Sequence, residues 1–175
     1  MSLTHPVNDL MNDHRRIEAV MNALEKNLKP GGPFPAEFVG RALAFFVEYA
    51  DGFHHHKEEE QLFPALAARG MPVEGGPIAM MLHEHDMGRK FLSGVRENLA
   101  KAGEGDATAQ SAVRENAARY IELLRNHIWK EDNILFAMAR QVLDESVAQQ
   151  LAEQFAGISG EGLEAHRQFA AAQTS

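Results

Sequence analysis

Histidine and glutamate residues gather in one stretch of the chain, which reads Phe53-His54-His55-His56-Lys57-Glu58-Glu59-Glu60-Gln61-Leu62-Phe63-Pro64. If this stretch is helical, side chains four positions apart share a face, so each histidine lies over the glutamate four positions later. An imidazole nitrogen and a carboxylate oxygen one turn apart can bind a single metal ion. Such a donor pair suits iron, manganese or zinc better than copper(I). Taken alone, the stretch is equally typical of a solvated, charged helix face.

The pattern recurs further along the chain, as Asn126-His127-Ile128-Trp129-Lys130-Glu131-Asp132-Asn133-Ile134-Leu135-Phe136. Aligning His54 with His127 also aligns Lys57 with Lys130, Glu58 with Glu131, Leu62 with Leu135 and Phe63 with Phe136. The element common to both copies is His-x-x-x-Glu, which selects His54 with Glu58 and His127 with Glu131. His55 and His56 align with Ile128 and Trp129, so we expect both histidines to lie on the outer face of their helix.

Composition narrows the classes of protein that need considering. A chain of 175 residues favours one domain, over residues 1–175. Acidic residues exceed basic ones by 25 − 17 = 8, which argues against a nucleic-acid partner or an anionic membrane surface. The absence of cysteine excludes disulfides, thiolate zinc sites and iron–sulfur ligation, so a metal site must use histidine and carboxylate. Without a signal-peptide pattern or an apolar run of ~20 residues, we expect a cytoplasmic location and no membrane segment.

Apolar residues recur at helical spacing in four long segments, over about 6–28, 35–69, 77–102 and 107–138. Proline and glycine punctuate the connections, and Pro64 is expected to kink the second helix. A short helix over 144–156 and a helical tail over 163–172 follow. The fold class predicted is all-α, an up-down-up-down antiparallel four-helix bundle with a short C-terminal helical extension. The bundle core covers about residues 6–140, and the extension covers 141–175.

Six polar groups occupy positions where these helices should be apolar: His14, His54, Glu58, His85, His127 and Glu131. A single histidine in such a position is usually a hydrogen-bonded core residue. Four of them, one per helix, accompanied by two carboxylates, require another explanation. A buried, unpaired carboxylate costs several kcal/mol, so two of them need a cation. Four imidazoles and two carboxylates that can each bridge suit two metal ions, with positions left open for an oxo or hydroxo bridge and a small ligand.

The combination of His14, His54-x-x-x-Glu58-Glu59-x-x-Leu62-Phe63-Pro64, Glu84-His85 and His127-x-x-x-Glu131 resembles the hemerythrin-like (HHE cation-binding) family. The resemblance covers about residues 8–140. It implies that the metals are two non-haem iron ions, with Glu58 and Glu131 as bridges and the four histidines as terminal ligands. The invertebrate oxygen carriers of this family have a fifth histidine one turn from the ligand on the third helix. Met81 and Arg89 hold those places here, and Glu131 replaces an aspartate, which points away from reversible oxygen transport.

The function implied is a di-iron protein that binds or senses dioxygen, nitric oxide or peroxide, or that handles iron. The alternative is an enzyme with the same site, which reduces peroxide or nitric oxide or donates iron in stress repair. A ferritin-like carboxylate oxidase needs Glu-x-x-His on two helices, a pattern the chain does not show. A metal-free helical interaction module is disfavoured by the buried carboxylates. No catalytic residue and no protein partner is assigned.

Several further residues lie near the predicted ligands in sequence. Glu18, one turn from His14, can act as a ligand or as a hydrogen-bond acceptor for one. His83 is expected on the surface, because it points about 200° around the helix from His85. Tyr49 and Tyr120 are expected to pack in the core, with a hydrogen bond into the site as the alternative.

Overall fold

The computed structural model describes residues 5–174, which form helices joined by short turns and contain no strand within that range. In chain order the elements are α1 (Pro6–Asn27), α2 (Ala36–Phe45), the π-helical segments η1 (Phe46–His55) and η2 (Glu58–Leu62), α3 (Phe63–Ala68), α4 (Pro77–Gly103), α5 (Ala107–Lys130), the π-helical η3 (Glu131–Leu135), α6 (Phe136–Val142), α7 (Glu145–Gly157) and α8 (Leu163–Ala171). The fold is therefore all-helical, as the sequence predicts.

Local sequence explains where the helices begin and end. Asp106 begins α5 by accepting a hydrogen bond from the amide of Ala109 at 2.8 Å, and Asp144 begins α7 in the same way through Val147 at 2.9 Å. Pro6 and Pro77 stand in the first turns of α1 and α4, where a proline leaves no hydrogen bond unmade. The turn after α3 needs a left-handed residue, which Gly70 supplies with φ of 89°.

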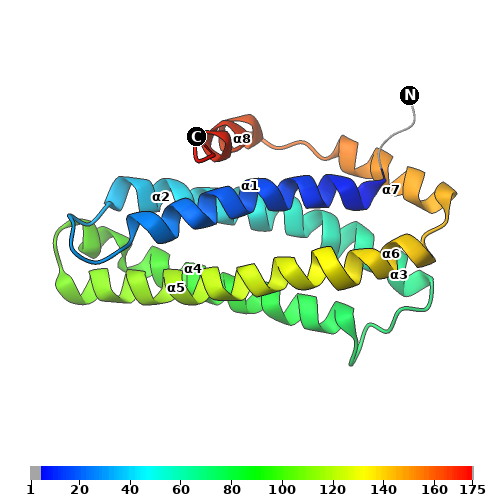
Figure 1. The fold of residues 1–175 in the computed structure, drawn as a ribbon, viewed down its shortest axis with the longest axis horizontal. Coiled ribbons are helices and arrows are strands. Elements are labelled where there is room, and N and C mark those ends of the chain that lie inside the picture. The colour runs from blue at the N-terminus through cyan, green and yellow to red at the C-terminus, as the bar shows by residue number, and fades with distance from the viewer. Residues whose placement is uncertain (1–4, 175) are drawn as a thin grey trace.

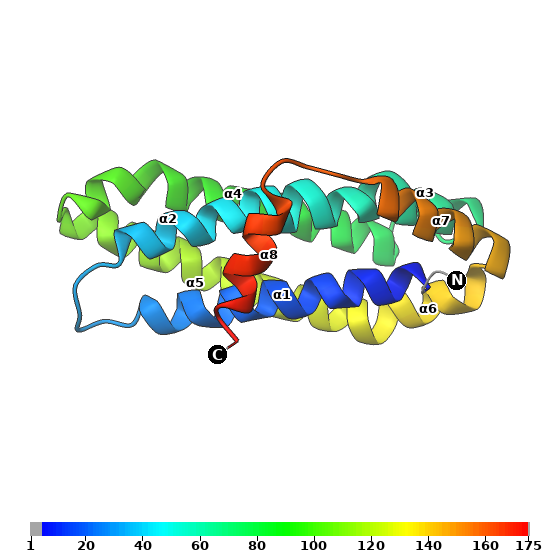
Figure 2. The ribbon, with the colours of Figure 1, turned by 90° about the horizontal axis from the view of Figure 1, so that it is seen from above.

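Four long helical stretches lie side by side as a bundle, and successive stretches run in opposite directions (Figure 1). They are α1, the continuous run from α2 to α3, α4, and the run from α5 to α6. The expected C-terminal extension is formed by α7 and α8. Of these, α7 contacts α1 and η2, whereas α8 crosses over α1 and η1 (Figure 2). No helix among the described residues is both long enough and apolar enough to cross a membrane.

The apolar core is divided into two clusters. One surrounds Phe45, Phe46 and Tyr120, and the other surrounds Leu10, Leu62 and Phe136. Between the two clusters, all four long stretches contribute buried polar residues instead of apolar ones. A layer of histidine and carboxylate side chains therefore interrupts the core part-way along the bundle.

Lys57 is a second polar feature of the interior, since its side chain is 2% exposed. Its ammonium group donates to Asp9 and to Asp13, each at 2.7 Å, and lies 4.0 Å from the centre of the Phe53 ring. Burial opposes the ionisation of Asp13, but His54 and Lys57 outweigh it and hold the pKa of Asp13 well below its usual range. Lys57 thus ties the second helical run to α1 and neutralises a buried carboxylate.

Replacing Lys57 by methionine should lower the free energy of unfolding of the metal-free protein by about 3–5 kcal/mol, because Asp13 is left as a buried and poorly compensated charge. Lys130→Met is the matched control. Lys130 holds the equivalent place in the repeat and donates to Glu84, but its side chain is 30% exposed. Replacing Lys130 should therefore lower the free energy of unfolding by less than replacing Lys57 does. Guanidinium-induced unfolding of both variants measures the difference, and equal losses would contradict a special role for Lys57.

Candidate metal centre

The polar layer brings together all six residues that the sequence singles out. His14 comes from α1, His54 from η1, Glu58 from η2, His85 from α4, His127 from α5 and Glu131 from η3. Each of the six is between 0% and 2% exposed. The sequence therefore predicted correctly that these residues are buried and that they come together.

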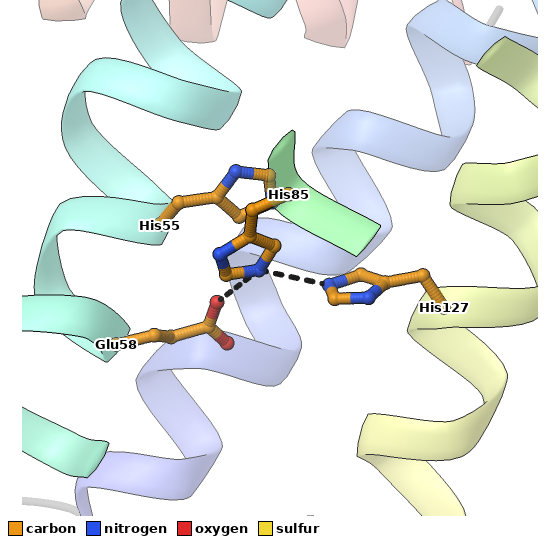
Figure 3. A group of neighbouring side chains, drawn as sticks. All are labelled: His55, Glu58, His85 and His127. Carbon is orange, nitrogen blue, oxygen red and sulfur yellow. Dashed lines mark hydrogen bonds and ion pairs between the residues drawn. The ribbon is translucent and has the colours of Figure 1, made fainter. Parts of the chain in front are cut away.

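Together with His55, these six residues form two groups of potential ligand atoms that share Glu58. One group contains His14, His54, Glu58 and Glu131, and the other contains His55, Glu58, His85 and His127. Within each group, one nitrogen or carboxylate oxygen per residue lies within 4.8 Å of the corresponding atom of every other member. Below, these groups are called the His14 half-site and the His85 half-site, and Figure 3 shows the second of them.

The two glutamates lie between the half-sites. Glu58 has Oε1 at 3.5 Å from Nε2 of His54 and Oε2 at 3.5 Å from Nε2 of His85. Glu131 has Oε2 at 3.2 Å from Nε2 of His14 and at 3.3 Å from Nε2 of His127. Each carboxylate therefore faces one histidine of either half-site, which is the arrangement that a bridging ligand requires.

Several buried polar atoms in the layer find no hydrogen-bond partner among residues 5–174. They include Nε2 of His14, Nε2 of His54 and both carboxylate oxygens of Glu58 and Glu131. In addition, Nε2 of His85 lies 3.1 Å from Nε2 of His127. A hydrogen bond between two imidazole nitrogens requires that one of them carries the proton and the other does not. Buried polar groups are normally paired. The unpaired atoms are imidazole nitrogens and carboxylate oxygens that converge, so the donor set fits metal ions of the iron or zinc type.

The other ring nitrogen, Nδ1, faces a carboxylate in every histidine of the two half-sites, and in all of them except His54 the two groups are hydrogen-bonded. The Nδ1-to-oxygen distances are 2.6 Å for His14 with Asp132, 3.5 Å for His54 with Asp13, 3.1 Å for His55 with Asp51, 2.6 Å for His85 with Glu59 and 2.9 Å for His127 with Glu84. A carboxylate at Nδ1 places the proton there and leaves Nε2 free to bind a metal.

Each of these carboxylates is itself paired with a cation. Arg15 pairs with Asp132, Lys57 with Asp13, Lys130 with Glu84, and Arg89 with both Asp51 and Glu59. From the interior outward, the charges therefore alternate between glutamate, imidazole, carboxylate and cation. This alternation allows the layer to keep its negative charge within the bundle.

The supporting carboxylates follow the internal repeat. Asp13 and Glu84 directly precede His14 and His85, and each supports the histidine on the partner helix of its own pair, His54 or His127. Glu59 and Asp132 directly follow Glu58 and Glu131, and each supports a histidine of the opposite helix pair. The repeat thus extends from the central histidines and glutamates to the carboxylates that support the histidines.

His55 corrects one expectation drawn from the repeat. Its side chain does not lie on the outer face but is 6% exposed and belongs to the His85 half-site. The alignment with Ile128 concealed it, although Asp51, four positions earlier, was a visible signal of a supported histidine. Its neighbour His56 is exposed, as expected.

The remaining nearby residues stay outside both half-sites. Glu18 forms an ion pair with Arg15 at 3.3 Å. His83 lies at the surface, as expected. The hydroxyl of Tyr49 donates a hydrogen bond to Asp13 at 2.6 Å, and Asp13 is the carboxylate that faces His54. Tyr120 packs against Phe46, with ring centres 5.0 Å apart.

Comparison with known proteins identifies the family to which the chain belongs. The family model described as the hemerythrin HHE cation-binding domain matches residues 5–139, which include every residue of the two half-sites. Over 164 residues, 92% of this chain, the sequence is 24% identical to an uncharacterized protein of Mycobacterium tuberculosis, and it spans 61% of that relative's length.

Two further relatives carry a functional name. The iron-sulfur cluster repair protein DnrN of Neisseria gonorrhoeae is 32% identical over 116 residues, which are 63% of this chain and 69% of the relative. The iron-sulfur cluster repair protein YtfE of Musicola paradisiaca is 35% identical over 89 residues, which are 49% of this chain and 40% of the relative. With the family model matching well over half of its length, this chain belongs to the hemerythrin HHE cation-binding domain family.

Proposed function

We propose that this protein holds two non-haem iron ions, one in each half-site, bridged by Glu58 and Glu131, and that it binds or senses a small ligand such as dioxygen, nitric oxide or peroxide. The observation that carries the proposal is the pair of buried glutamates, each of which faces a histidine of both half-sites at 3.2–3.5 Å. The proposal includes one domain over residues 1–175 with an up-down-up-down bundle, which the alternating helix directions support (Figure 1).

When bound, two iron ions would supply a redox-active Lewis acid. The protein's own contribution is orientation and exclusion of bulk water. The supporting carboxylates fix the ring orientation of each histidine and raise its basicity. Apolar side chains on both sides of the layer, including Phe136, whose ring stacks on His14 with centres 5.5 Å apart, keep the centre dry. Such surroundings favour a small ligand over a bulky substrate.

A pocket of about 310 Å³ lies between the N-terminal part of α1, the second helical run and the C-terminal extension. Asp9, Asp13, Arg16 and Lys57 line it together with Arg167 from α8. Because Asp13 also supports His54, the polar wall of this pocket is one side chain away from a proposed ligand. We propose that a small ligand or an iron ion approaches the centre from this pocket.

Iron donation is the second candidate function, favoured by the similarity to proteins named for iron–sulfur cluster repair. This chain has no cysteine, so a donation mechanism here would not use a thiol of its own. The two functions differ in the fate of the iron. A binding or sensing protein keeps its iron when it meets the ligand, whereas a donor releases it.

Protons compete with the metal ions for the histidines. Burial opposes protonation of His14, but Asp132 and Glu131 outweigh it and raise the pKa of His14 to about 9. For His127, burial likewise opposes protonation, and Glu131 and Glu84 raise its pKa to about 10. At neutral pH the metal-free layer therefore carries imidazolium groups as its cations, and metal binding must displace their protons.

The first prediction concerns stoichiometry. Purified protein reconstituted with ferrous iron and then exposed to air should contain two iron ions per chain and absorb in the near ultraviolet through ligand-to-iron charge transfer. The double variant Glu58→Gln and Glu131→Gln should bind neither ion, and its metal-free fold should be less stable at neutral pH, because it lacks the carboxylates that stabilise the imidazolium forms of His14 and His127. Metal analysis and thermal melts with and without iron decide the matter. If iron raises the melting temperature of the double variant as much as that of the wild type, Glu58 and Glu131 are not the bridging ligands.

A second prediction follows from the raised pKa values of His14 and His127. Because their pKa is higher in the folded than in the unfolded chain, whose value is ~6.5, their contribution to stability is complete below that value and is lost as the pH rises through about 9 and 10. The metal-free protein should therefore lose stability between pH 7 and pH 10. With iron bound, this loss should disappear, since the histidines are then neutral at every pH in the window. Urea unfolding at a series of pH values measures both trends.

The third prediction separates binding from donation. Iron-loaded protein is mixed anaerobically with nitric oxide, in the presence of a strong ferrous chelator that absorbs in the visible range. For a binding or sensing protein, the ultraviolet and visible spectrum of the centre should change while the chelator stays colourless and two irons remain on the chain. Coloured chelator appearing at the rate of the spectral change would favour donation instead.

A further inference from the structure

His55 is the one histidine of the two half-sites that the internal repeat does not predict. It lies 6% exposed in the His85 half-site, with a ligand atom within 4.8 Å of those of Glu58, His85 and His127 (Figure 3). Its helix is π-helical up to His55 itself, so that His54 and His55 both reach the polar layer, one for each half-site. Position alone makes it a candidate donor.

The surroundings of His55 match those of His14, His85 and His127, each of which has a carboxylate hydrogen-bonded to Nδ1. Its Nδ1 lies 3.1 Å from Oδ1 of Asp51, and Arg89 donates to the two oxygens of Asp51 at 3.0 and 3.1 Å. The same cation also holds Glu59, the carboxylate that supports His85. A histidine that only filled space would not need a half-buried carboxylate and a cation to fix its Nδ1. With Nδ1 engaged, Nε2 is the nitrogen left for a metal.

This support is present in only one of the two helix pairs. The positions equivalent to Asp51 and His55 are Leu124 and Ile128, which are 4% and 2% exposed and pack in the apolar core. Arg89 occupies one of the two places where a fifth histidine of the oxygen carriers would be expected, and here it holds Asp51 instead. The two helix pairs therefore differ at this position, where only the first pair has a histidine, His55, with a carboxylate at its Nδ1.

We propose that His55 is a fifth imidazole ligand, oriented by Asp51 and Arg89. The His85 half-site then offers three imidazoles, and the His14 half-site offers two. This inference rests on the proposed di-iron function. Because the half-sites differ in the number of imidazoles, they should also differ in affinity, and loss of His55 should weaken one of two binding steps and spare the other.

The competing explanation is packing. The ring of His55 stacks on that of His85, with ring centres 3.7 Å apart and planes inclined by 15°. The variant His55→Phe separates the two explanations, because a phenyl ring keeps the stack and lacks a donor nitrogen. His55→Ala removes both the stack and the nitrogen. His56→Ala is the matched control, since His56 is the adjacent residue on the same helix and is exposed.

The test is a titration of the metal-free full-length chains with cobalt(II), followed by visible absorption and by metal analysis after gel filtration. Wild type and His56→Ala should bind two ions per chain. His55→Phe and His55→Ala should weaken one step by at least ~10–100-fold, the range observed when a group that only supports a ligand is lost. Asp51→Asn should weaken the same step by a smaller factor. Circular dichroism checks that each variant is folded.

The outcomes distinguish the inference from the function on which it rests. If His55→Phe binds both ions as tightly as the wild type, His55 is a packing residue and the inference fails, while the di-iron proposal stands. If the wild type itself binds fewer than two ions, the di-iron proposal fails first. If His55→Ala weakens cobalt binding but His55→Phe binds cobalt as the wild type does, His55 is likewise a packing residue. Weakening of one step in both variants, with His56→Ala unchanged, supports ligation.

Discussion

The burial of Glu58 and Glu131 is the constraint on which the rest of the structure depends. Both carboxylates are 0% exposed, at a depth where an uncompensated charge costs several kcal/mol. Four histidines must therefore face them, and the core must divide into two apolar clusters to make room. With metal ions bound, the carboxylates and imidazoles share the charge. Without them, the raised pKa values of His14 and His127 show that protons take that role.

The supporting carboxylates solve the second part of the same problem. An imidazole bound to a metal through Nε2 needs its Nδ1 proton held, and a carboxylate placed there needs a cation of its own. Four of the supporting carboxylates directly precede or follow a proposed ligand in the sequence. Asp13-His14 and Glu84-His85 are one type of pair, and Glu58-Glu59 and Glu131-Asp132 are the other. Because the links run within and between the two helix pairs, neither half-site is oriented independently of the other.

The sequence alone predicted the helical class, the helix positions and the burial of the six central residues, because helical spacing shows which positions should be apolar. It did not predict the π-helical segments, although a signal was present. Buried residues recur every four positions at Phe46, Ala50, His54, Glu58 and Leu62, all 0–1% exposed. In an α-helix such a series would rotate about 40° per step, or about 160° in all, and would leave the core. The wider π-helical turns of η1 and η2 keep it facing inward.

The place of His55 could not be derived from the repeat, because its equivalent in the other copy, Ile128, is apolar. The spacing of four between Asp51 and His55 was a signal in the sequence, but the contact of Arg89 with Asp51 joins two helices and becomes visible only in the structure. The π-helical segments η2 and η3, by contrast, occur in both copies, and only the first copy has a proline nearby. Proline is therefore not their cause. Segments of this kind are frequent at functional sites, and here both begin at a glutamate of the centre.

The distribution of the half-sites along the chain has a consequence for protein synthesis. The His14 half-site takes residues from near the N-terminus but lacks Glu131 until the fourth long helix has emerged, and the His85 half-site lacks His127 until almost the same point. The contact between His14 and Asp132 joins residues 118 positions apart. A growing chain that ends before this region contains neither complete donor set. Only the assembled bundle therefore offers a metal ion either complete donor set.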